Sequence, residues 1–261
     1  MAFMKQSVGN SPSTTRKVLK HMIYDVFGIS ASEALVGTCI KRCGFTRKKT
    51  RSRPCKIADP HVVDEFLSDF TKARRLQKTI VSIDETGFDD TSLPLMGYSS
   101  KGCRLVIKHP RTSWKRMSAT AAVCTSGTIN FSLSDKPVNS ERFENFLSSL
   151  NLPKDSVLLL DNIAFHKTKK VRALANTRGW QLLFTPPYSP WYNPIENVFS
   201  VVKNTFRRVN ARDIIQGVSS SAITRHSAVR DAFASVTPEL VAACFRHVDD
   251  LCRSAAYERE I

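Results

Sequence analysis

The first sixty residues carry apolar positions at helical spacing. Adjacent apolar pairs recur every four residues within 13–27, which predicts a helix that Gly28 ends. A second periodic segment follows, with Ser30 or Ser32 as its N-cap, and it stops before Gly44. Two short helices joined by a tight glycine-containing turn are typical of a helix-turn-helix unit, although any helical hairpin shows the same pattern.

The pattern changes after residue 60. An amphipathic helix over 61–72 is expected to connect two modules. Strand-like runs follow it, and their turn signals favour an antiparallel meander. These runs are Thr79–Asp84, Arg104–Lys108, Met117–Cys124 and Thr128–Leu133, with a hairpin turn at Ser126-Gly127 between the last two.

From residue 139 onward, helical and strand-like patterns alternate. The predicted elements are a helix over 140–150 capped by Asn139 or Ser140, a strand over 156–160, a helix near 168–177, a strand over 180–184, and a longer helix after a proline-rich loop. Two further helical segments cover 221–236 and 238–257. Strands alternating with helices after a meander predict an α/β fold, a mixed sheet flanked by helices.

A chain of 261 residues is long enough for one domain of about 150 to 200 residues and a smaller module. We therefore divide it into four parts. Residues 1–57 form a basic helix-turn-helix module and linker, 58–78 a connecting helix, 79–212 the larger α/β domain, and 213–261 a C-terminal helical segment.

The net charge of the chain indicates the chemistry of its binding partner. The chain has 39 Lys and Arg against 23 Asp and Glu, a formal charge of +16. The stretch 1–60 contributes 12 basic and 3 acidic residues, which is +9 of that total. A basic excess concentrated in one module predicts a polyanion that carries phosphate groups as the partner.

The densest basic segment is 41–56, which has eight basic residues and no acid. Lys and Arg at this density contact the phosphate backbone rather than bases, so the affinity should depend strongly on salt. A basic but merely solvated linker is the alternative interpretation. The DNA-contacting candidates here are Lys41, Arg42, Arg47, Lys48, Lys49, Arg51 and Arg53.

No window approaches the roughly 20 apolar residues of a membrane span, and no secretory signal is visible. Seven cysteines form no CxxC pair, and no second ligand pair with zinc-finger spacing follows Cys39 and Cys43. We expect an intracellular protein, in the nucleus if the host is eukaryotic and in the cytoplasm if it is bacterial, with no membrane partner.

Three acidic residues stand at the edges of apolar elements. Asp84 and Asp161 each close a predicted strand, and Glu196 lies in the first turn of the helix after the proline-rich loop. Carboxylate oxygens are preferred ligands of Mg²⁺, and three of them from separate elements can hold a metal pair of the kind used for phosphodiester chemistry. For any one of them, a structural strand-end acid is the simpler interpretation.

The helix that carries Glu196 allows two interpretations. Asn193 as N-cap, Pro194 as the first helical residue and Glu196 as the third would form a purely structural capping box. Alternatively, Glu196 is aligned along one exposed face with Ser200, Lys203 and Arg207. An acid followed by two bases along this face favours a metal ligand with phosphate contacts behind it.

Several motifs occur in one order along the chain. They are Asp84-Glu85 after a strand, Tyr98–Gly102, the run LLLDNIAFH with Asp161, Asn162 and His166, and PPYSPWYNPIENVFSVVKN, with 34 residues between Asp161 and Glu196. Over about 80–208 the sequence resembles the catalytic core of D-D-E transposases of the mariner type and their bacterial insertion-sequence relatives. The segment Ser30–Lys49 is similar to the second helix-turn-helix of that family.

This resemblance implies a ribonuclease-H-like fold, dependence on two Mg²⁺ or Mn²⁺ ions, and action as a homodimer on double-stranded DNA. The implied reaction is cleavage at transposon ends and joining of the 3′-hydroxyl to target DNA, commonly at TA. Asp84, Asp161 and Glu196 match the metal-binding triad. Asn162 and His166 lie in the second motif, where roles beside the ligands or in contact with DNA are implied.

The sequence departs from the family pattern in two places. About one helix-turn-helix unit fits before Asp84, where family members usually have two, and Trp191-Tyr192 replaces an acid-Leu pair. The main hypothesis is an active transposase. A truncated or domesticated descendant that binds DNA without transposing, and a ribonuclease-H-like nuclease that cuts without joining, are the alternatives.

Overall fold

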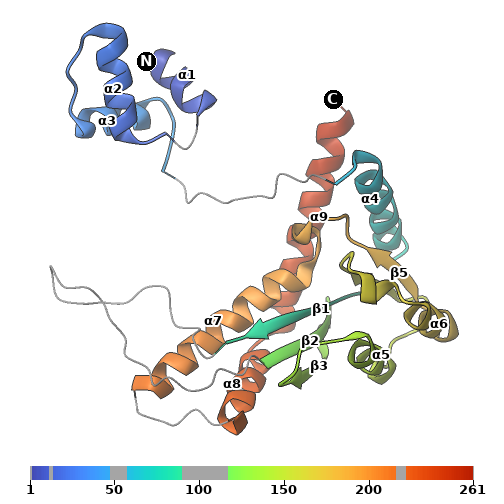
Figure 1. Ribbon diagram of the computed structural model, residues 1–261. Helices are drawn as coiled ribbons and strands as arrows, with labels where there is room; N and C mark the ends of the chain where they lie inside the picture. Colours follow the sequence, from blue (N-terminus) through green and yellow to red (C-terminus); the bar gives the residue numbers. More distant parts are fainter. Residues whose placement is uncertain (1, 12–13, 48–57, 90–116, 216–221, 261) are drawn as a thin grey trace. The chain divides into compact units, whose positions relative to one another are not determined.

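The computed structural model describes residues 2–11, 14–47, 58–89, 117–215 and 222–260 (Figure 1). It divides into two compact units, Met1–Cys55 and Lys56–Ile261. The first contains α1 (Ala2–Asn10), α2 (Arg16–Phe27) and α3 (Glu33–Arg42). The finer division of the sequence into four parts stays a prediction.

Local capping explains where the helices of the N-terminal unit begin and end. The Thr15 hydroxyl accepts a hydrogen bond from an N–H group in the first turn of α2, and Ser32 does the same for α3, so Ser32 rather than Ser30 is the N-cap. Gly28 ends α2 with φ 67°, a left-handed conformation in which glycine carries no Cβ penalty.

The N-terminal unit has a small hydrophobic core shared by its three helices. It is formed by Met4, Leu19, Ala31, Val36 and Cys43. The hydrophobic pattern does not predict α1, because Met4 is the one buried residue among those nine and neither end of the helix has an evident cap. The described part of this unit therefore contains three helices rather than a helical pair.

In the described residues, the second unit is built on a mixed sheet of five strands. Its strands are β1 (Ile80–Phe88), β2 (Met117–Cys124), β3 (Gly127–Ser134), β4 (Val157–Leu160) and β5 (Gln181–Phe184), in the order β3-β2-β1-β4-β5. Strands β1, β2 and β3 pair antiparallel, while β4 pairs parallel with both β1 and β5. The predicted α/β architecture is thus confirmed, and β1, β2 and β3 form an antiparallel meander in the described residues.

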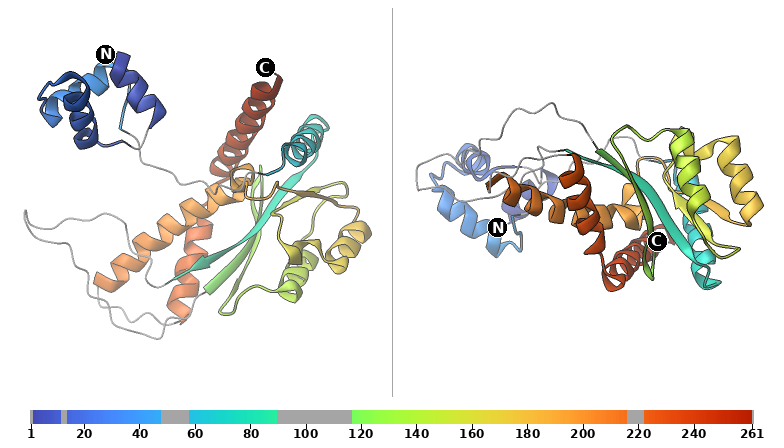
Figure 2. Two further views of the ribbon diagram at one scale, coloured as in Figure 1. Left: turned by 45° about the horizontal axis from the view of Figure 1, so that its top comes forward. Right: turned by 90° about the horizontal axis from the view of Figure 1, so that it is seen from below.

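Helices cover both faces of the sheet. They are α4 (Pro60–Arg75), α5 (Ser140–Ser149), α6 (Lys169–Arg178), α7 (Pro194–Ile215), α8 (Ala222–Ala234) and α9 (Pro238–Glu260). Buried residues of α5 and α6 share one core with the sheet, and those of α4, α7, α8 and α9 share the other. Figure 2 shows α5 and α6 on the side of the sheet opposite to α7 and α8. No helix in the described ranges is long and apolar enough to cross a membrane.

The alternation of side chains along β1 assigns its residues to these two layers. Ile80 and Phe88 belong to the core with α7, whereas Val81 and Ile83 belong to the core with α5. By the same period of two, Asp84 points toward the α7 layer. Glu85 points toward the α5 layer.

Some boundaries differ from those that the sequence pattern predicts. Strand β1 does not end at Asp84 but continues to Phe88, because β2 pairs with it along that whole length. The turn between β2 and β3 is at Thr125-Ser126, one residue earlier than expected. The predicted strand over 104–108 and the Tyr98–Gly102 motif lie outside the described residues.

Candidate active site

Two neighbouring parallel strands bring Asp84 and Asp161 together. Strands β1 and β4 pair in the register Ile80 with Val157 and Ser82 with Leu159. Continuing this register by two residues places Asp84 opposite Asp161. Because β4 ends at Leu160 while β1 continues, the two carboxylates lie where the strands separate, at the carboxyl edge of the parallel part of the sheet. This edge is where ligands bind in open α/β sheets.

Asp84 is a buried carboxylate with its oxygens held in place. Its Oδ1 accepts a hydrogen bond of 2.7 Å from the Glu85 N–H, and its Oδ2 accepts one of 3.0 Å from Asn193 Nδ2. Burial raises the pKa of Asp84 to about 8, and the charges of Asp161, Glu196 and Glu85 add to this, while the hydrogen bond from Glu85 opposes it. A cation beside Asp84 would therefore favour its ionised form.

A buried polar cluster ties the start of α7 to β1. The hydroxyl of Ser82 donates to Asn193 Oδ1 and accepts a hydrogen bond of 3.2 Å from the Ile195 N–H. The Asn193 side chain bonds to Ser82 and Asp84, so the predicted capping box with Asn193 as its N-cap side chain is wrong. A hydroxyl from the sheet satisfies a free N–H at the helix start instead.

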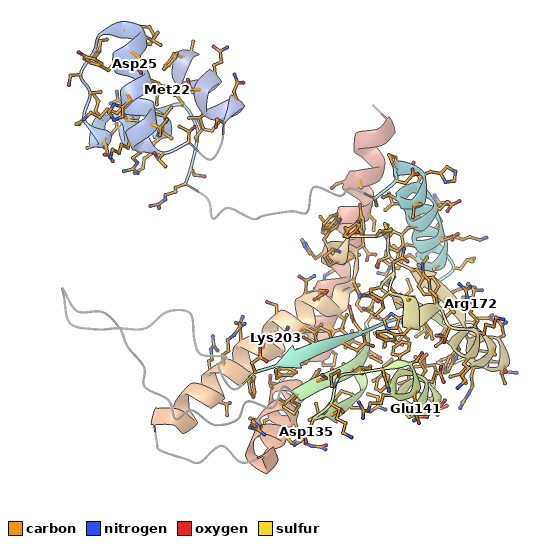
Figure 3. All side chains as sticks on the ribbon, in the orientation of Figure 1. Met22, Asp25, Asp135, Glu141, Arg172 and Lys203 are labelled. Carbon is orange, nitrogen blue, oxygen red and sulfur yellow. The ribbon has the colours of Figure 1, made fainter. Side chains whose placement is uncertain are left out.

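Glu196 stands in the first turn of α7 and is exposed. Partial desolvation of its carboxyl nevertheless raises its pKa; the charge of Lys203 opposes this rise, and that of Asp161 adds to it. Figure 3 shows Lys203 on α7, the helix that packs against β1. The first turn of a helix also favours a negative charge.

The three acids act on one another electrostatically, since both Asp161 and Glu196 raise the pKa of Asp84. Within the described ranges, no three His, Cys, Asp or Glu side chains are arranged to hold a metal ion as they stand. Asp161 Oδ1 explains part of this: it is buried, lies 2.6 Å from His166 Nδ1, and has no partner with hydrogen-bond geometry. Asp161 Oδ1 can therefore still accept a bond, and Asp84 is desolvated. With Glu196, these carboxylates offer oxygen ligands that fit a hard divalent cation.

His166 lies in the turn η1 (Ala164–Lys167) directly behind these acids. Its side chain is fully buried, with Nδ1 toward Asp161 and Nε2 3.1 Å from Glu85 Oε1. Burial lowers the pKa of His166, but the adjacent carboxylates of Asp161 and Glu85 outweigh it and raise the pKa to about 9. Such burial leaves no surface for DNA. Asn162 accepts a hydrogen bond from Lys167 Nζ.

The predicted DNA-contacting residues fall into two places. Lys41, Arg42 and Arg47 are exposed at and after the end of α3. Lys203 and Arg207 are half-buried along α7. The other four, Lys48, Lys49, Arg51 and Arg53, lie outside the described residues. Contact with DNA stays a prediction for all of them.

Sequence reasoning misses three residues of this site, Ser82, Glu85 and Asn193, as parts of the acid cluster. A signal exists for the first: Ser82 shares the face of Asp84 because the two are separated by one residue in a strand. Asn193 resembles an ordinary N-cap in sequence. The role of Glu85 depends on a histidine 81 residues away.

Residues 79–216, more than half of the chain, match the model of a protein family described as DDE superfamily endonuclease. The chain belongs to the DDE superfamily endonucleases. All three acids lie within the matched range. None of the curated protein sequences matches this endonuclease.

Solved structures show the same fold. The Mos1 transposase paired-end complex with left transposon end has a TM-score of 0.73 and 18% identity, covering 98% of this chain and 77% of the Mos1 chain. The Mos1 Strand Transfer Complex has a TM-score of 0.70, 18% identity and the same coverages. The Mos1 mariner paired end complex with Mn has a TM-score of 0.69 and 18% identity, covering 98% and 76%. The ribonuclease-H-like fold of the DDE endonuclease is thereby established.

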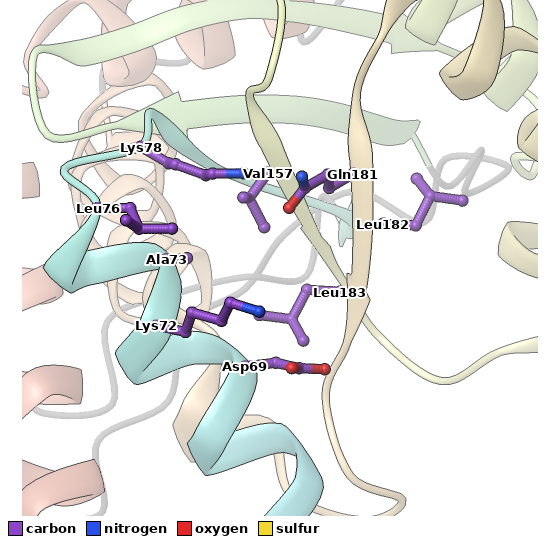
Figure 4. A pocket seen from close by; sticks show the side chains of 9 residues that line it. All are labelled: Asp69, Lys72, Ala73, Leu76, Lys78, Val157, Gln181, Leu182 and Leu183. Carbon is purple, nitrogen blue, oxygen red and sulfur yellow. The ribbon is translucent and has the colours of Figure 1, made fainter.

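A cavity of about 230 Å³ lies elsewhere, between α4 and β5 (Figure 4). Asp69, Lys72 and Lys78 line it together with Val157 and Gln181, the first residues of β4 and β5. Since Asp161 follows the other end of β4, the cavity is separate from the acid cluster.

Proposed function

We propose that this endonuclease is a transposase of the mariner type that cleaves DNA at transposon ends and joins the freed 3′-hydroxyl to target DNA. The observation that supports the proposal is the register of β1 with β4, which sets Asp84 opposite Asp161, together with a Glu196 in α7 whose charge acts on Asp84. Each comes from a different element, and the charges of the other two both act on Asp84. A desolvated acid among acids is the arrangement expected of a cation site at an active centre.

Asp84, Asp161 and Glu196 would hold Mg²⁺ or Mn²⁺, two ions in the full site. When bound, these ions supply activation of the attacking oxygen and stabilisation of the leaving oxygen in phosphodiester transfer. The chain's own residues prepare the site. Asn193 orients Asp84 from the helix side, the Glu85 N–H orients it from the strand, and Lys203 places a positive charge near Glu196.

The DNA would be held mainly by positive charge. Lys203 and Arg207 extend along α7 away from Glu196, in line with a phosphate backbone that leads from the reacting bond. The basic segment that follows α3 would contact a second stretch of duplex. Action at two transposon ends favours a homodimer, and DNA as substrate favours the nucleus in a eukaryotic host or the cytoplasm in a bacterial one.

The deciding experiment uses the element's own ends as substrate. Wild-type protein with Mg²⁺ or Mn²⁺ should nick the end DNA and transfer the strand to a target plasmid. Asp84→Ala and Glu196→Gln should abolish both reactions while a gel-shift assay shows unchanged DNA binding, because neither change removes a basic residue. Sequencing the gene's flanks for inverted repeats bordered by TA duplications identifies the substrate.

Two other outcomes point to the alternatives. A wild-type protein that binds the ends but neither nicks nor joins them would be a domesticated DNA-binding descendant. Nicking without strand transfer would indicate a nuclease. Either result overturns the proposed transposase.

A further inference from the structure

We propose that Glu85 and His166 form a positioning pair that fixes the orientation of Asp84 relative to Asp161, and thereby sets the metal affinity of the site. This inference rests on the proposed function, since it assigns the metal ligands in the same way. Neither residue of the pair is itself placed to bind the metal or DNA.

A continuous series of contacts joins the two aspartates through this pair. The Glu85 N–H donates to Asp84 Oδ1 at 2.7 Å. On the other face of β1, Glu85 Oε1 lies 3.1 Å from His166 Nε2. The opposite ring nitrogen, Nδ1, lies 2.6 Å from Asp161 Oδ1. The contacts therefore lead from Asp84 through Glu85 in β1 and the His166 ring to Asp161.

The ring of His166 is held too tightly to take another role. Its side chain has no exposed surface. The Phe143 ring packs on it with centroids 4.1 Å apart, and the Phe165 ring meets it edge-on at 4.5 Å. With both nitrogens directed at carboxylates and both sides packed by aromatic rings, His166 can orient Asp161 but cannot turn toward a substrate.

The charge of the cluster supports the same assignment. Four acids meet here, namely Asp84, Glu85, Asp161 and Glu196. Among the described cations, Lys203 acts on Glu196, and Lys167 binds Asn162. His166 is the group that lies between Glu85 and Asp161. Its rigid ring, with one nitrogen toward each carboxylate, holds the two carboxylates apart at fixed positions.

The test measures Mn²⁺ binding to the full chain without DNA, by electron paramagnetic resonance of free Mn²⁺ and by calorimetry. Partners that hydrogen-bond to metal ligands typically contribute about 10- to 100-fold to metal affinity. His166→Gln and Glu85→Ala should each raise the Kd for Mn²⁺ by about that factor. Glu85→Gln keeps an acceptor for His166 Nε2, so it should recover most of the affinity that Glu85→Ala loses.

The matched control is Phe146→Leu, which reduces packing in the same core without touching any acid. It should lower the Tm and leave the Kd for Mn²⁺ unchanged. If His166→Gln does not fold, the comparison of Glu85→Ala with Glu85→Gln still decides the question.

A wild-type Kd for Mn²⁺ in folded Glu85→Ala would overturn the positioning pair, as would an equal loss in Glu85→Ala and Glu85→Gln. These results are distinguishable from failure of the proposed function, which is read from strand transfer. A wild-type protein without strand transfer but with the expected order of Mn²⁺ affinities would reject the transposase and retain the pair.

Discussion

Replacing Asp84 by Asn should stabilise the metal-free protein although it removes a metal ligand. The pKa of Asp84 rises from 3.8 to about 8 on folding, so the folded state binds its proton more tightly than the unfolded state does. The contribution of this group to stability is therefore greatest at low pH. It is lost as the pH rises from about 4 to about 8, because the unfolded carboxyl ionises first.

The size of the change in the free energy of unfolding follows from the shift in the pKa of Asp84. Each pKa unit corresponds to about 1.4 kcal/mol, so the ionisable Asp84 costs the fold about 2 kcal/mol at pH 5 and about 5 kcal/mol at pH 7.5. Asn does not ionise. The free energy of unfolding of Asp84→Asn minus that of wild type should therefore increase by about 3 kcal/mol between these pH values. Any loss from the changed hydrogen bonds to Glu85 and Asn193 is independent of pH and cancels in this increase.

Urea unfolding in EDTA, followed by tryptophan fluorescence, measures this difference. All three tryptophans lie within 56–261, so the signal reports the catalytic unit alone. His166 also loses stability as the pH rises from 6.5 through about 9, but wild type and variant share this contribution. Asp89→Asn, at an exposed acid one residue after β1, is the matched control and should show no such increase.

Metal provides the second half of the test. At pH 7.5, Mg²⁺ at about 100 times its Kd should stabilise wild type by about 3 kcal/mol and have a much smaller effect on Asp84→Asn. A difference between wild type and Asp84→Asn that stays constant from pH 5 to 7.5 would refute the proposed desolvation of Asp84.

Three further predictions concern other parts of the molecule. Ser82→Ala removes the buried hydroxyl that receives the first N–H of α7, so urea unfolding should show a loss of about 1 to 3 kcal/mol, with no loss expected of an exposed Ser200→Ala control. Neutralising Lys48, Lys49 and Arg51 should weaken binding to all DNA sequences and flatten the salt dependence of the Kd in fluorescence anisotropy; an unchanged slope would reject phosphate contacts there. Lys203→Gln removes a charge that lowers the pKa of Glu196, so the acidic limb of the pH profile of Mn²⁺ binding should move to higher pH, and a stationary limb would contradict the coupling.

Local patterns in the sequence are sufficient for most elements of the fold. The predicted bounds of β2 agree with the structure, those of α5 differ by one residue at its end, and those of α6 differ by one residue at each end. Capping residues such as Asn139 and Thr168 mark those helix starts, because the capping bond involves residues only three apart. The hydrophobic pattern does not predict α1, because a single buried side chain cannot establish a helical period.

The sequence indicates Asp84, Asp161 and Glu196 through their order, their placement beside apolar elements, the 34-residue interval and the neighbouring motifs. The parallel pairing of β1 with β4 sets Asp84 opposite Asp161, and strand alternation decides the face toward which Asp84 points. Both are properties of the backbone. What the tertiary structure alone decided is how those carboxylates are held. Asn193 bonds to Asp84 rather than capping its own helix, and His166 reaches Glu85, because these two contacts join residues 109 and 81 positions apart that only the folded sheet brings together.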